Sequence, residues 1–453
     1  MKRSKLLPRW IAASLLLASS FIPANAAPHK QRMVVVISLD GFPAYALDDP
    51  RLPIPTLRKL AREGAVATSM QPINPTVTWP NHTAMVTGVN ASQHQVLFNG
   101  LLTRNPADGS MTVEPWRDKD LLVHAPTVYD VAYKAGLTTA QVDWVAIYGA
   151  KTITWQFPEE PDPKGLIEGH LIQAGVVTPA QLANFDDSSP AWQDEIRTDA
   201  AVEILKRYKP NLMLFHLLSL DDLNHEYGPM GNASLETMAF LDDRVKEIVT
   251  AIQSAGLAQQ TTILVVSDHG FRKISHNIYA NAILRREGFV KDENGKPIWG
   301  TWIVPDGGSA MVYVNDPARR AELIPKLTTL FSGVEGVDRV YQQQEFAGLG
   351  LPTREQSDQA PDLLLSAKPG YVFSGGTQGG ENDKSEAGTH GYLNSDPQMQ
   401  SVFFAWGRGI RPGTHLDHIS NLDIAPTISA LLGLEMKAVT GHPLQEILSD
   451  PRP

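Results

Sequence analysis

The stretch Met33-Val34-Val35-Val36-Ile37-Ser38-Leu39 decides the fold that we expect for this chain. All of its side chains except that of Ser38 are apolar, and the valines and Ile37 are β-branched. An unbroken apolar run of this length is typical of a strand that is buried on both faces of a sheet. The stretch therefore predicts a central strand of an α/β protein.

Outward from this strand, apolar runs alternate with segments of helical periodicity. The runs cover residues 211–220, 261–267 and 401–405, and the main helical segments cover residues 55–63, 194–208 and 235–254. Buried strands that alternate with amphipathic helices indicate a doubly wound sheet. We expect a mainly parallel sheet with helices on both of its faces.

The alternation weakens between residues 274 and 386, where Gly-rich and Pro-rich stretches divide the chain into short elements. We interpret residues 274–386 as an inserted cap or side subdomain. The core of the protein would then comprise residues 27–273 and 387–453.

The N-terminal residues 1–26 have the features of a secretory signal peptide. Basic residues precede the apolar run 10–21, and Ala24-Asn25-Ala26 is a small-x-small cleavage site. The alternative, an uncleaved membrane anchor, is disfavoured because no second long apolar stretch follows. We expect a periplasmic or secreted protein without a stable membrane span.

Charge and cysteine content exclude several kinds of site. The formal net charge is −10, and removing the four basic residues of the signal lowers it to −14, so non-specific coating of nucleic acid is not expected. The absence of cysteine excludes a thiol nucleophile, cysteine-ligated zinc and iron–sulfur clusters. Any bound metal must have histidine and carboxylate ligands.

Carboxylates follow three of the apolar runs: Asp40, Asp221 and Asp268. Ligands of an open α/β sheet bind beyond the carboxyl ends of the strands, so we expect these side chains to meet there. They would repel one another unless cations lay between them.

Histidines accompany these carboxylates. His225 follows Asp221 by four residues, which one helical turn would place on the same face, and His269 follows Asp268 directly. His390 lies in the glycine-flanked sequence Thr389-His390-Gly391. Oxygen and imidazole ligands without thiolate favour zinc over manganese or iron, and we predict a site for two metals.

A hydroxyl nucleophile is expected near the sequence PTVTWPNH, residues 75–82. Pro80 is suited to the first turn of a helix, whose N-terminus attracts anionic phosphate. Spacing alone does not distinguish Thr78 from Thr76 or Thr83, and any of them could also be a helix cap.

The chain resembles the nucleotide pyrophosphatase/phosphodiesterase family of the alkaline phosphatase superfamily. The matching stretches, in the order of the family, are Ile37-Ser38-Leu39-Asp40-Gly41, Thr78-Trp79-Pro80-Asn81-His82 with Val86-Thr87-Gly88, residues 221–229 (DDLNHEYGP), Ser267-Asp268-His269-Gly270, Gly388-Thr389-His390-Gly391-Tyr392 and residues 421–427 (NLDIAPT). They span nearly the whole chain after the signal.

The resemblance implies specific roles for these residues. Thr78 would be the nucleophile and would share one Zn²⁺ with Asp40, Asp268 and His269, whereas Asp221, His225 and His390 would hold the other. Attack by Thr78 would give a phosphothreonine intermediate. Asn99, in residues 94–100 (HQVLFNG), would hydrogen-bond a phosphoryl oxygen, helped by the backbone N–H of Trp79.

The substrate class is less constrained by the sequence. No basic residue adjoins Thr78 or Asn99, which favours diesters over monoesters. An aromatic Trp79 can stack on a nucleobase or belong to the core. Residues 143–149 (DWVAIYG) replace a Trp-Pro-Gly stretch that is common in the family, and Tyr148 or Trp144 would then form the second wall of a base slot.

We therefore expect an exported two-zinc phosphodiesterase or nucleotide pyrophosphatase that acts on a small phosphodiester or nucleotide. Three alternatives stay open at this point. Two are enzymes of the same superfamily, a phosphomonoesterase and a lipid or choline phosphodiesterase. The third is an inactive protein that binds metal or ligand.

Overall fold

The computed structural model describes residues 31–293, 296–378 and 384–449. The expected signal peptide, residues 1–26, lies outside the described residues. Within these ranges, none of the helices has both the length and the apolar character that crossing a membrane requires.

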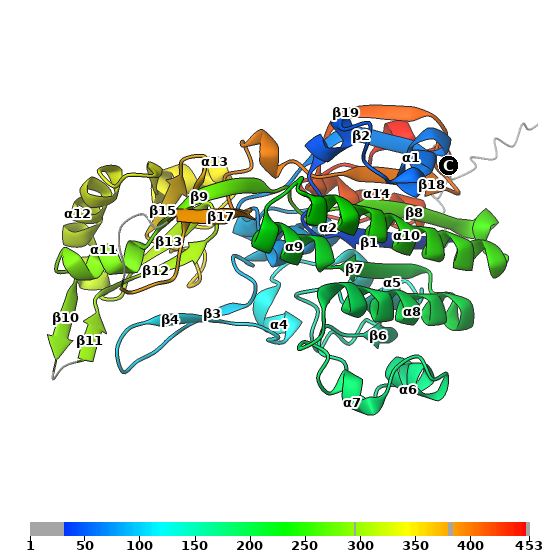
Figure 1. Cartoon of the computed structure of the whole chain (residues 1–453), viewed down its shortest axis with the longest axis horizontal. Coiled ribbons are helices and arrows are strands. Elements are labelled where there is room, and N and C mark those ends of the chain that lie inside the picture. The colour runs from blue at the N-terminus through cyan, green and yellow to red at the C-terminus, as the bar shows by residue number, and fades with distance from the viewer. Residues whose placement is uncertain (1–30, 294–295, 379–383, 450–453) are drawn as a thin grey trace, which may run out of the picture.

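An eight-stranded sheet forms the centre of the molecule (Figure 1). Its strands, in spatial order, are β19 (Thr414–Ser420), β2 (Ala65–Gln71), β18 (Phe403–Gly407), β8 (Thr261–Val266), β1 (Met33–Leu39), β7 (Leu212–Leu217), β5 (Thr139–Val142) and β6 (Trp155–Phe157). All neighbouring pairs are parallel except the two that β18 makes with β2 and β8. The predicted mainly parallel sheet is confirmed.

Helices cover both faces of this sheet, as predicted (Figure 1). One face packs on α1 (Pro55–Glu63), α8 (Pro190–Tyr208) and α10 (Asn232–Ser254), and the other on α2 (Thr78–Thr87), α5 (Val128–Lys134) and α14 (Ile424–Leu431). The remaining helices of this part are α3 (Ala91–His94), α4 (Lys119–Leu122), α6 (Leu166–Gln173), α7 (Pro179–Leu182) and α9 (Ser219–Tyr227).

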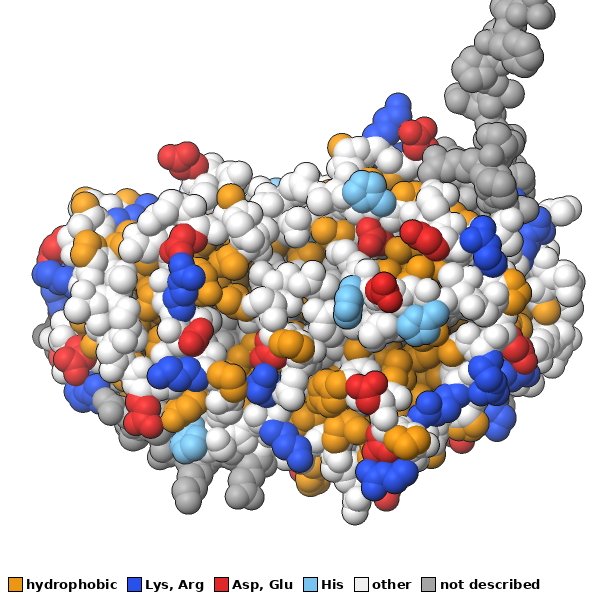
Figure 2. Space-filling model, turned by 90° about the horizontal axis from the view of Figure 1, so that it is seen from above, with side chains coloured by type: hydrophobic (Ala, Val, Ile, Leu, Met, Phe, Trp, Pro, Cys, Tyr) orange, Lys and Arg blue, Asp and Glu red, His pale blue; other side chains and the backbone are white. Residues whose placement is uncertain are grey.

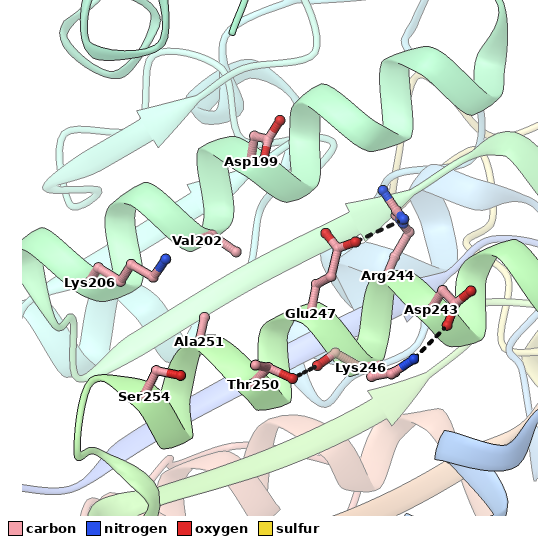
Figure 3. Close-up of a pocket in the computed structure, with 10 residues that line it drawn as sticks. All are labelled: Asp199, Val202, Lys206, Asp243, Arg244, Lys246, Glu247, Thr250, Ala251 and Ser254. Atoms are coloured by element: carbon pink, nitrogen blue, oxygen red, sulfur yellow. Dashed lines mark hydrogen bonds and ion pairs between the residues drawn. The ribbon is translucent and has the colours of Figure 1, made fainter. Parts of the chain in front are cut away.

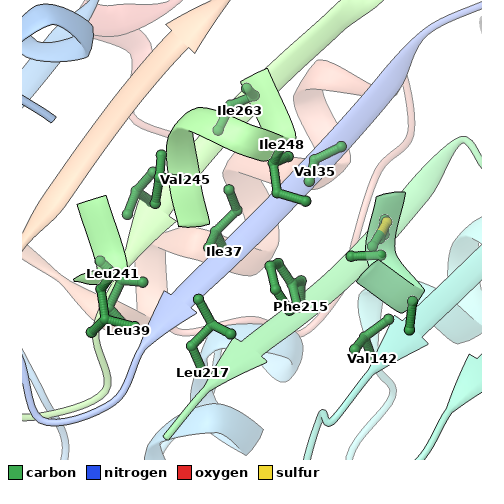
Figure 4. Close-up of a cluster of buried hydrophobic side chains, with 14 of the residues drawn as sticks. Val35, Ile37, Leu39, Val142, Phe215, Leu217, Leu241, Val245, Ile248 and Ile263 are labelled. Carbon is green, nitrogen blue, oxygen red and sulfur yellow. The ribbon is translucent and has the colours of Figure 1, made fainter. Parts of the chain in front are cut away.

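Strand β1 contributes side chains to both apolar layers. Val35, Ile37 and Leu39 join the cluster under α10, where Val245 and Ile248 contact them from above (Figure 4). The alternate residues of β1 enter the cluster on the opposite face. This alternation explains why the strand is apolar along nearly its whole length.

Residues 272–389 contribute no described strand to the central sheet and form three smaller sheets beside it (Figure 1). Their elements are β9 (Arg272–Ile278), α11 (Ala280–Arg286), β10 (Val290–Glu293), β11 (Lys296–Trp299), β12 (Thr301–Asp306), β13 (Ser309–Val314), α12 (Arg320–Ser332), β14 (Val337–Gln342), α13 (Phe346–Leu349), β15 (Leu363–Ala367), β16 (Tyr371–Phe373) and β17 (Lys384–Thr389). The hairpin of β3 (Leu101–Arg104) and β4 (Met111–Glu114) lies against them through a Trp299 N–H to Asp108 hydrogen bond. The division into core and inserted subdomain stays an interpretation.

One expected strand is shorter than predicted. The sequence indicated a strand over residues 211–220, but β7 ends at Leu217 and α9 begins at Ser219. The carboxylate of Asp194 accepts hydrogen bonds from the backbone N–H groups of Leu218 (3.0 Å) and Ser219 (2.9 Å). This buried acceptor, remote in sequence, satisfies the free donors at the start of the helix.

Candidate metal centre

The six predicted metal ligands lie in two groups at the carboxyl end of the central sheet. Asp40, Asp268 and His269 offer ligand atoms within 4.8 Å of one another, and so do Asp221, His225 and His390. Asp40 follows β1, the 268–269 pair follows β8, and Asp221 lies in the first turn of α9. The geometry places the residues in the same two sets that the resemblance implies.

Short distances connect the ligand atoms within each group. In the first, His269 Nε2 lies 3.2 Å from Asp268 Oδ2 and 3.5 Å from Asp40 Oδ1. In the second, Asp221 Oδ2 lies 3.4 Å from His225 Nε2, and Asp221 Oδ1 lies 3.8 Å from His390 Nε2. The groups adjoin, because His269 Nε2 is 4.0 Å from Asp221 Oδ1.

The carboxylates of this centre lack hydrogen-bond donors at the atoms that face it. Asp40 Oδ1, Asp221 Oδ1 and Asp268 Oδ2 are buried without a hydrogen-bond partner. Burial and the nearby carboxylates of Asp268 and Asp221 raise the pKa of Asp40 well above its usual range, and burial raises that of Asp268 to about 7. Buried, unpaired carboxylate oxygens of this kind fit bound cations.

The histidines are oriented by backbone carbonyl groups. Each donates from Nδ1: His225 to Gly388 O (3.1 Å), His269 to Gly270 O (3.2 Å) and His390 to Thr76 O (2.9 Å). Burial lowers the pKa of His390 to about 4 and also lowers that of His269. The neutral rings of His269 and His390, which donate from Nδ1, present the lone pair of Nε2 to the centre, as metal-binding histidines do.

The structure separates the three candidate threonines. Thr78 Oγ1 lies 3.5 Å from His269 Nε2, at the first residue of α2. The other two hydroxyls donate to backbone carbonyl groups, Thr76 to Tyr392 O (2.6 Å) and Thr83 to Trp79 O (2.7 Å). Of these three, only Thr78 presents its hydroxyl to the metal ligands.

Asn99 is connected to the same helix start. Its Oδ1 accepts the backbone N–H of Trp79 at 2.9 Å. The amide group Nδ2 is therefore the part of Asn99 that can donate to a substrate, and the Trp79 N–H orients it. The resemblance implied that the Trp79 N–H also helps to bind the phosphoryl oxygen, whereas in the structure this N–H donates to Asn99 Oδ1.

The tryptophans predicted as walls of a base slot are buried among other side chains of the protein. Trp79 is 3% exposed and packs with Val96, Leu122, Val145 and Ala146, and Trp144 is 1% exposed. The hydroxyl of Tyr148 donates to Glu159 Oε2 at 3.3 Å. This packing favours the core role of Trp79 over stacking, whereas base binding by Tyr148 stays a prediction.

Sequence reasoning missed His216, which contacts the predicted metal ligand Asp40 on the side away from the candidate centre. Its Nε2 donates to Asp40 Oδ2 at 2.9 Å. A sequence signal existed, because His216 is the single polar residue in the strand Leu212–Leu217 (LMLFHL). A polar side chain buried among apolar ones needs a partner, and here the partner is a metal ligand.

A groove between α8 and α10 is separate from the predicted site residues. It has a volume of about 460 Å³, and its charged lining residues include the Arg244–Glu247 pair at 2.9 Å (Figure 3). On the face seen in Figure 2, acidic and basic side chains are interspersed. None of the residues that line the groove is a predicted metal ligand.

Comparisons with known proteins give the following similarities. The family model "Type I phosphodiesterase / nucleotide pyrophosphatase" matches residues 34–393. The human ectonucleotide pyrophosphatase/phosphodiesterase family member 1 is 23% identical over 88% of this chain and 40% of that protein. The mouse family member 7 is 22% identical over 95% of this chain and 91% of that protein.

A similar solved structure is that of murine ectonucleotide pyrophosphatase/phosphodiesterase 5, an inactive form in complex with AMP. It has a TM-score of 0.70 and 18% sequence identity, and the match covers 92% of this chain and 100% of that one. This likeness agrees with the α/β architecture described above.

Proposed function

Because the chain belongs to the type I phosphodiesterase / nucleotide pyrophosphatase family, we propose that it is an exported two-zinc phosphodiesterase or nucleotide pyrophosphatase. The relatives named above are hydrolases of phosphodiester bonds. Export is supported by the signal features of residues 1–26 and by the ectoenzyme names of those relatives. The substrate would be a small phosphodiester or a nucleotide.

One observation carries the proposal. The Thr78 hydroxyl faces two adjoining groups of ligands whose buried carboxylate oxygens have no hydrogen-bond donor. A protein that only binds ligand has no need for a hydroxyl at this position, which argues against the inactive alternative. Asp40, Asp268 and His269 with Thr78 would hold one Zn²⁺, and Asp221, His225 and His390 the other.

The cations would supply Lewis-acid polarisation of the phosphoryl group and lower the pKa of the hydroxyl. The Thr78 hydroxyl gives its proton to solvent and Oγ1 attacks phosphorus; the bond from phosphorus to the leaving oxygen breaks, and that oxygen takes the electron pair and then a proton from solvent. The product is a phosphothreonine. Water then attacks phosphorus from the opposite side and releases one proton, the bond to Thr78 Oγ1 breaks, and Oγ1 takes up a proton, which restores the hydroxyl.

Asn99 completes the site as a hydrogen-bond donor. Its Nδ2 group donates to a phosphoryl oxygen, and the 2.9 Å bond from Trp79 N–H to Oδ1 keeps the amide in that orientation. Because the orientation exists before substrate binds, little reorganisation is needed as charge develops in the transition state.

The charge balance around the ligands favours diesters. Within the described ranges, none of the six ligands forms an ion pair with Lys or Arg. A monoester carries an additional negative charge that such cations usually neutralise. We therefore rank a phosphodiesterase above the phosphomonoesterase alternative.

The nucleophile is tested by replacing Thr78 with alanine in the zinc-loaded protein. We expect kcat for bis-p-nitrophenyl phosphate to fall roughly a thousand-fold or more, because the attacking oxygen is lost. Thr83→Ala is the matched control, since it removes a buried hydroxyl of the same helix that bonds only a backbone carbonyl group. Full activity of Thr78→Ala with zinc bound would contradict the mechanism.

The substrate class is tested on the unmodified protein with a panel of chromogenic esters. We expect kcat/KM to be higher for bis-p-nitrophenyl phosphate and a nucleoside p-nitrophenyl phosphate than for p-nitrophenyl phosphate. Preference for the monoester would instead support a phosphomonoesterase, and preference for p-nitrophenyl phosphocholine a lipid or choline phosphodiesterase. Elemental analysis of the same sample identifies and counts the metals.

A further inference from the structure

A chain of buried charged side chains begins at the metal ligand Asp40. His216 donates from Nε2 to Asp40 Oδ2 (2.9 Å) and from Nδ1 to the backbone carbonyl of Asp143 (3.0 Å). The carboxylate of Asp143 also lies 3.3 Å from His216 Nδ1. His216 therefore bridges the ligand of one metal group and an aspartate from a different part of the sheet edge.

The chain of contacts continues to the helix of the second metal group. Arg197 Nε lies 3.1 Å from Asp143 Oδ1, and its Nη1 donates to Asp194 Oδ1 at 3.1 Å. Asp194 accepts the N–H groups of Leu218 and Ser219, where α9 begins. Asp221 is in the first turn of this helix, and His225 is one turn further on.

We propose that His216, Asp143, Arg197 and Asp194 are positioning residues that set the geometry of the two groups of metal ligands relative to each other. The inference rests on the two-metal function proposed above. One end of the network fixes Oδ2 of Asp40, which leaves Oδ1 directed at the centre. The other end fixes the start of α9, which determines where Asp221 and His225 lie.

Burial makes this network rigid. The side chains of all four residues are at most 2% exposed, so water does not compete for their ion pairs and hydrogen bonds. Buried ion pairs are weak evidence of a stabilising role, because well-packed apolar residues often serve the stability of a fold as well or better. The termination of both ends on metal-ligand elements points to a positional role, since partners of metal ligands affect metal affinity.

The end at Asp40 is tested with two amides at position 216. His216→Gln places an amide nitrogen near the position of Nε2 and retains the hydrogen bond to Asp40. His216→Asn places the amide nitrogen near the position of Nδ1 and retains only the hydrogen bond to the Asp143 carbonyl. We expect His216→Asn to weaken zinc binding about 10- to 100-fold in a chelator competition and to lower kcat. We expect His216→Gln to recover most of both losses.

The end at α9 is tested with Asp194→Asn and a matched control. Asp242, 1% exposed, also accepts two N–H groups at a helix start, those of Thr56 (2.9 Å) and Leu57 (2.7 Å) of α1, but α1 carries no metal ligand. Both variants should lower the unfolding temperature, since each loses a charged acceptor of helix N–H groups. Only Asp194→Asn should also weaken zinc binding.

A milder variant covers the case in which Asp194→Asn does not fold. Asp143 has a φ of 58°, a conformation that asparagine tolerates well, so Asp143→Asn should fold and still weaken zinc binding. Suppose that the wild-type protein binds zinc and cleaves diesters. If His216→Asn and Asp143→Asn then retained the zinc affinity and the kcat of the wild type, the positioning role alone would be overturned. A wild-type protein that binds no zinc would overturn the proposed function and this inference together.

Discussion

The side chain of Asn99 has one acceptor and one donor group, and the backbone of Trp79 determines how they are used. Because Trp79 N–H can only donate, it selects Oδ1 as its partner and directs Nδ2 away from the helix. The same contact connects the segment just before β3 to the start of α2, where Thr78 lies. A single hydrogen bond thus positions the proposed donor, Asn99 Nδ2, relative to the proposed nucleophile, Thr78.

We predict that Asn99→Ala lowers kcat for a diester by roughly 100- to 1,000-fold, because a donor to the developing negative charge is lost. Asn99→Asp should lower it further, since a carboxylate cannot donate and repels the phosphoryl group. Steady-state kinetics at saturating substrate provides the measurement. Asn105→Ala, which removes a side chain that accepts the Ala107 N–H in an exposed turn, should leave kcat unchanged.

Glu168 is a buried carboxyl group outside the metal centre, in the first turn of α6. Burial raises its pKa to about 7 from a usual value of 4.5. The folded state therefore binds a proton that the unfolded state releases, and the associated stability is present below pH 4.5 and lost as pH rises through about 7.

We predict that Glu168→Gln reduces the loss of stability between pH 5 and pH 8. The amide of glutamine does not titrate in this pH range, so the free energy of unfolding of the variant should rise relative to that of the wild type as the pH rises. Urea denaturation at several pH values and constant zinc concentration measures the difference. Parallel pH dependence of the two proteins would show that Glu168 does not titrate in this window.

At the scale of elements, the loop after β17 depends on the glycine that follows His390. Gly391 has a φ of 80°, and a Cβ atom there would lie 1.8 Å from the backbone oxygen of Asp306 in the β12–β13 hairpin. Its N–H donates to Thr76 O, the acceptor that His390 Nδ1 also uses. The four-stranded sheet that contains β12 and β13, the loop after β17 and the segment around Thr76 therefore meet at one close contact.

We predict that Gly391→Ala destabilises the protein by more than Gly136→Ala and lowers activity. Gly136 has a similar φ of 78°, but a Cβ atom there would meet nothing within 4 Å, so its replacement should cost only the backbone strain, about 1–2 kcal/mol. The additional clash at Gly391 should displace His390. Denaturant midpoints and zinc content measure both effects, and equal midpoints would contradict the prediction.

At the scale of the whole molecule, the candidate metal centre joins residues that are about 350 positions apart in the chain, since Asp40 and His390 both belong to it. Asp40 lies near the start of the described residues, and His390 follows the last strand of the smaller sheets. Without cations, the raised pKa of Asp268 means that its stability contribution is present at acidic pH and lost as pH rises through about 7. Bound cations favour the ionised carboxylates and should reverse this trend.

We predict that removing the metals with a chelator lowers the unfolding temperature, and that the decrease is larger at pH 8 than at pH 6. Ligands that bind only the folded state stabilise it by about 2.7 kcal/mol at a hundred-fold excess over Kd. Calorimetry before and after dialysis against chelator, with zinc added back as a control, measures the effect. An unchanged unfolding temperature at pH 8 would contradict a metal centre in this position.

The architecture was accessible from the sequence because its signals are local and strong. The run 33–39 is apolar along the strand, and helix α1 has the bounds 55–63 that its periodicity predicted. The 211–220 strand was predicted too long, because the start of α9 depends on Asp194, whose position beside Leu218 has no local signature. Long-range hydrogen bonds of this kind set boundaries that periodicity does not contain.

The sequence by itself determined the family, the class of fold and the residues of the candidate centre, since these depend on residue types and their order along the chain. Spacing along the chain did not separate Thr78 from Thr76 and Thr83; the resemblance pointed to Thr78, and the tertiary structure gave the physical difference, the partner of each hydroxyl. The tertiary structure was also needed to reveal that His216 and Arg197 connect the two groups of predicted ligands. Such contacts join residues that are far apart in sequence, and only the folded chain defines their distances.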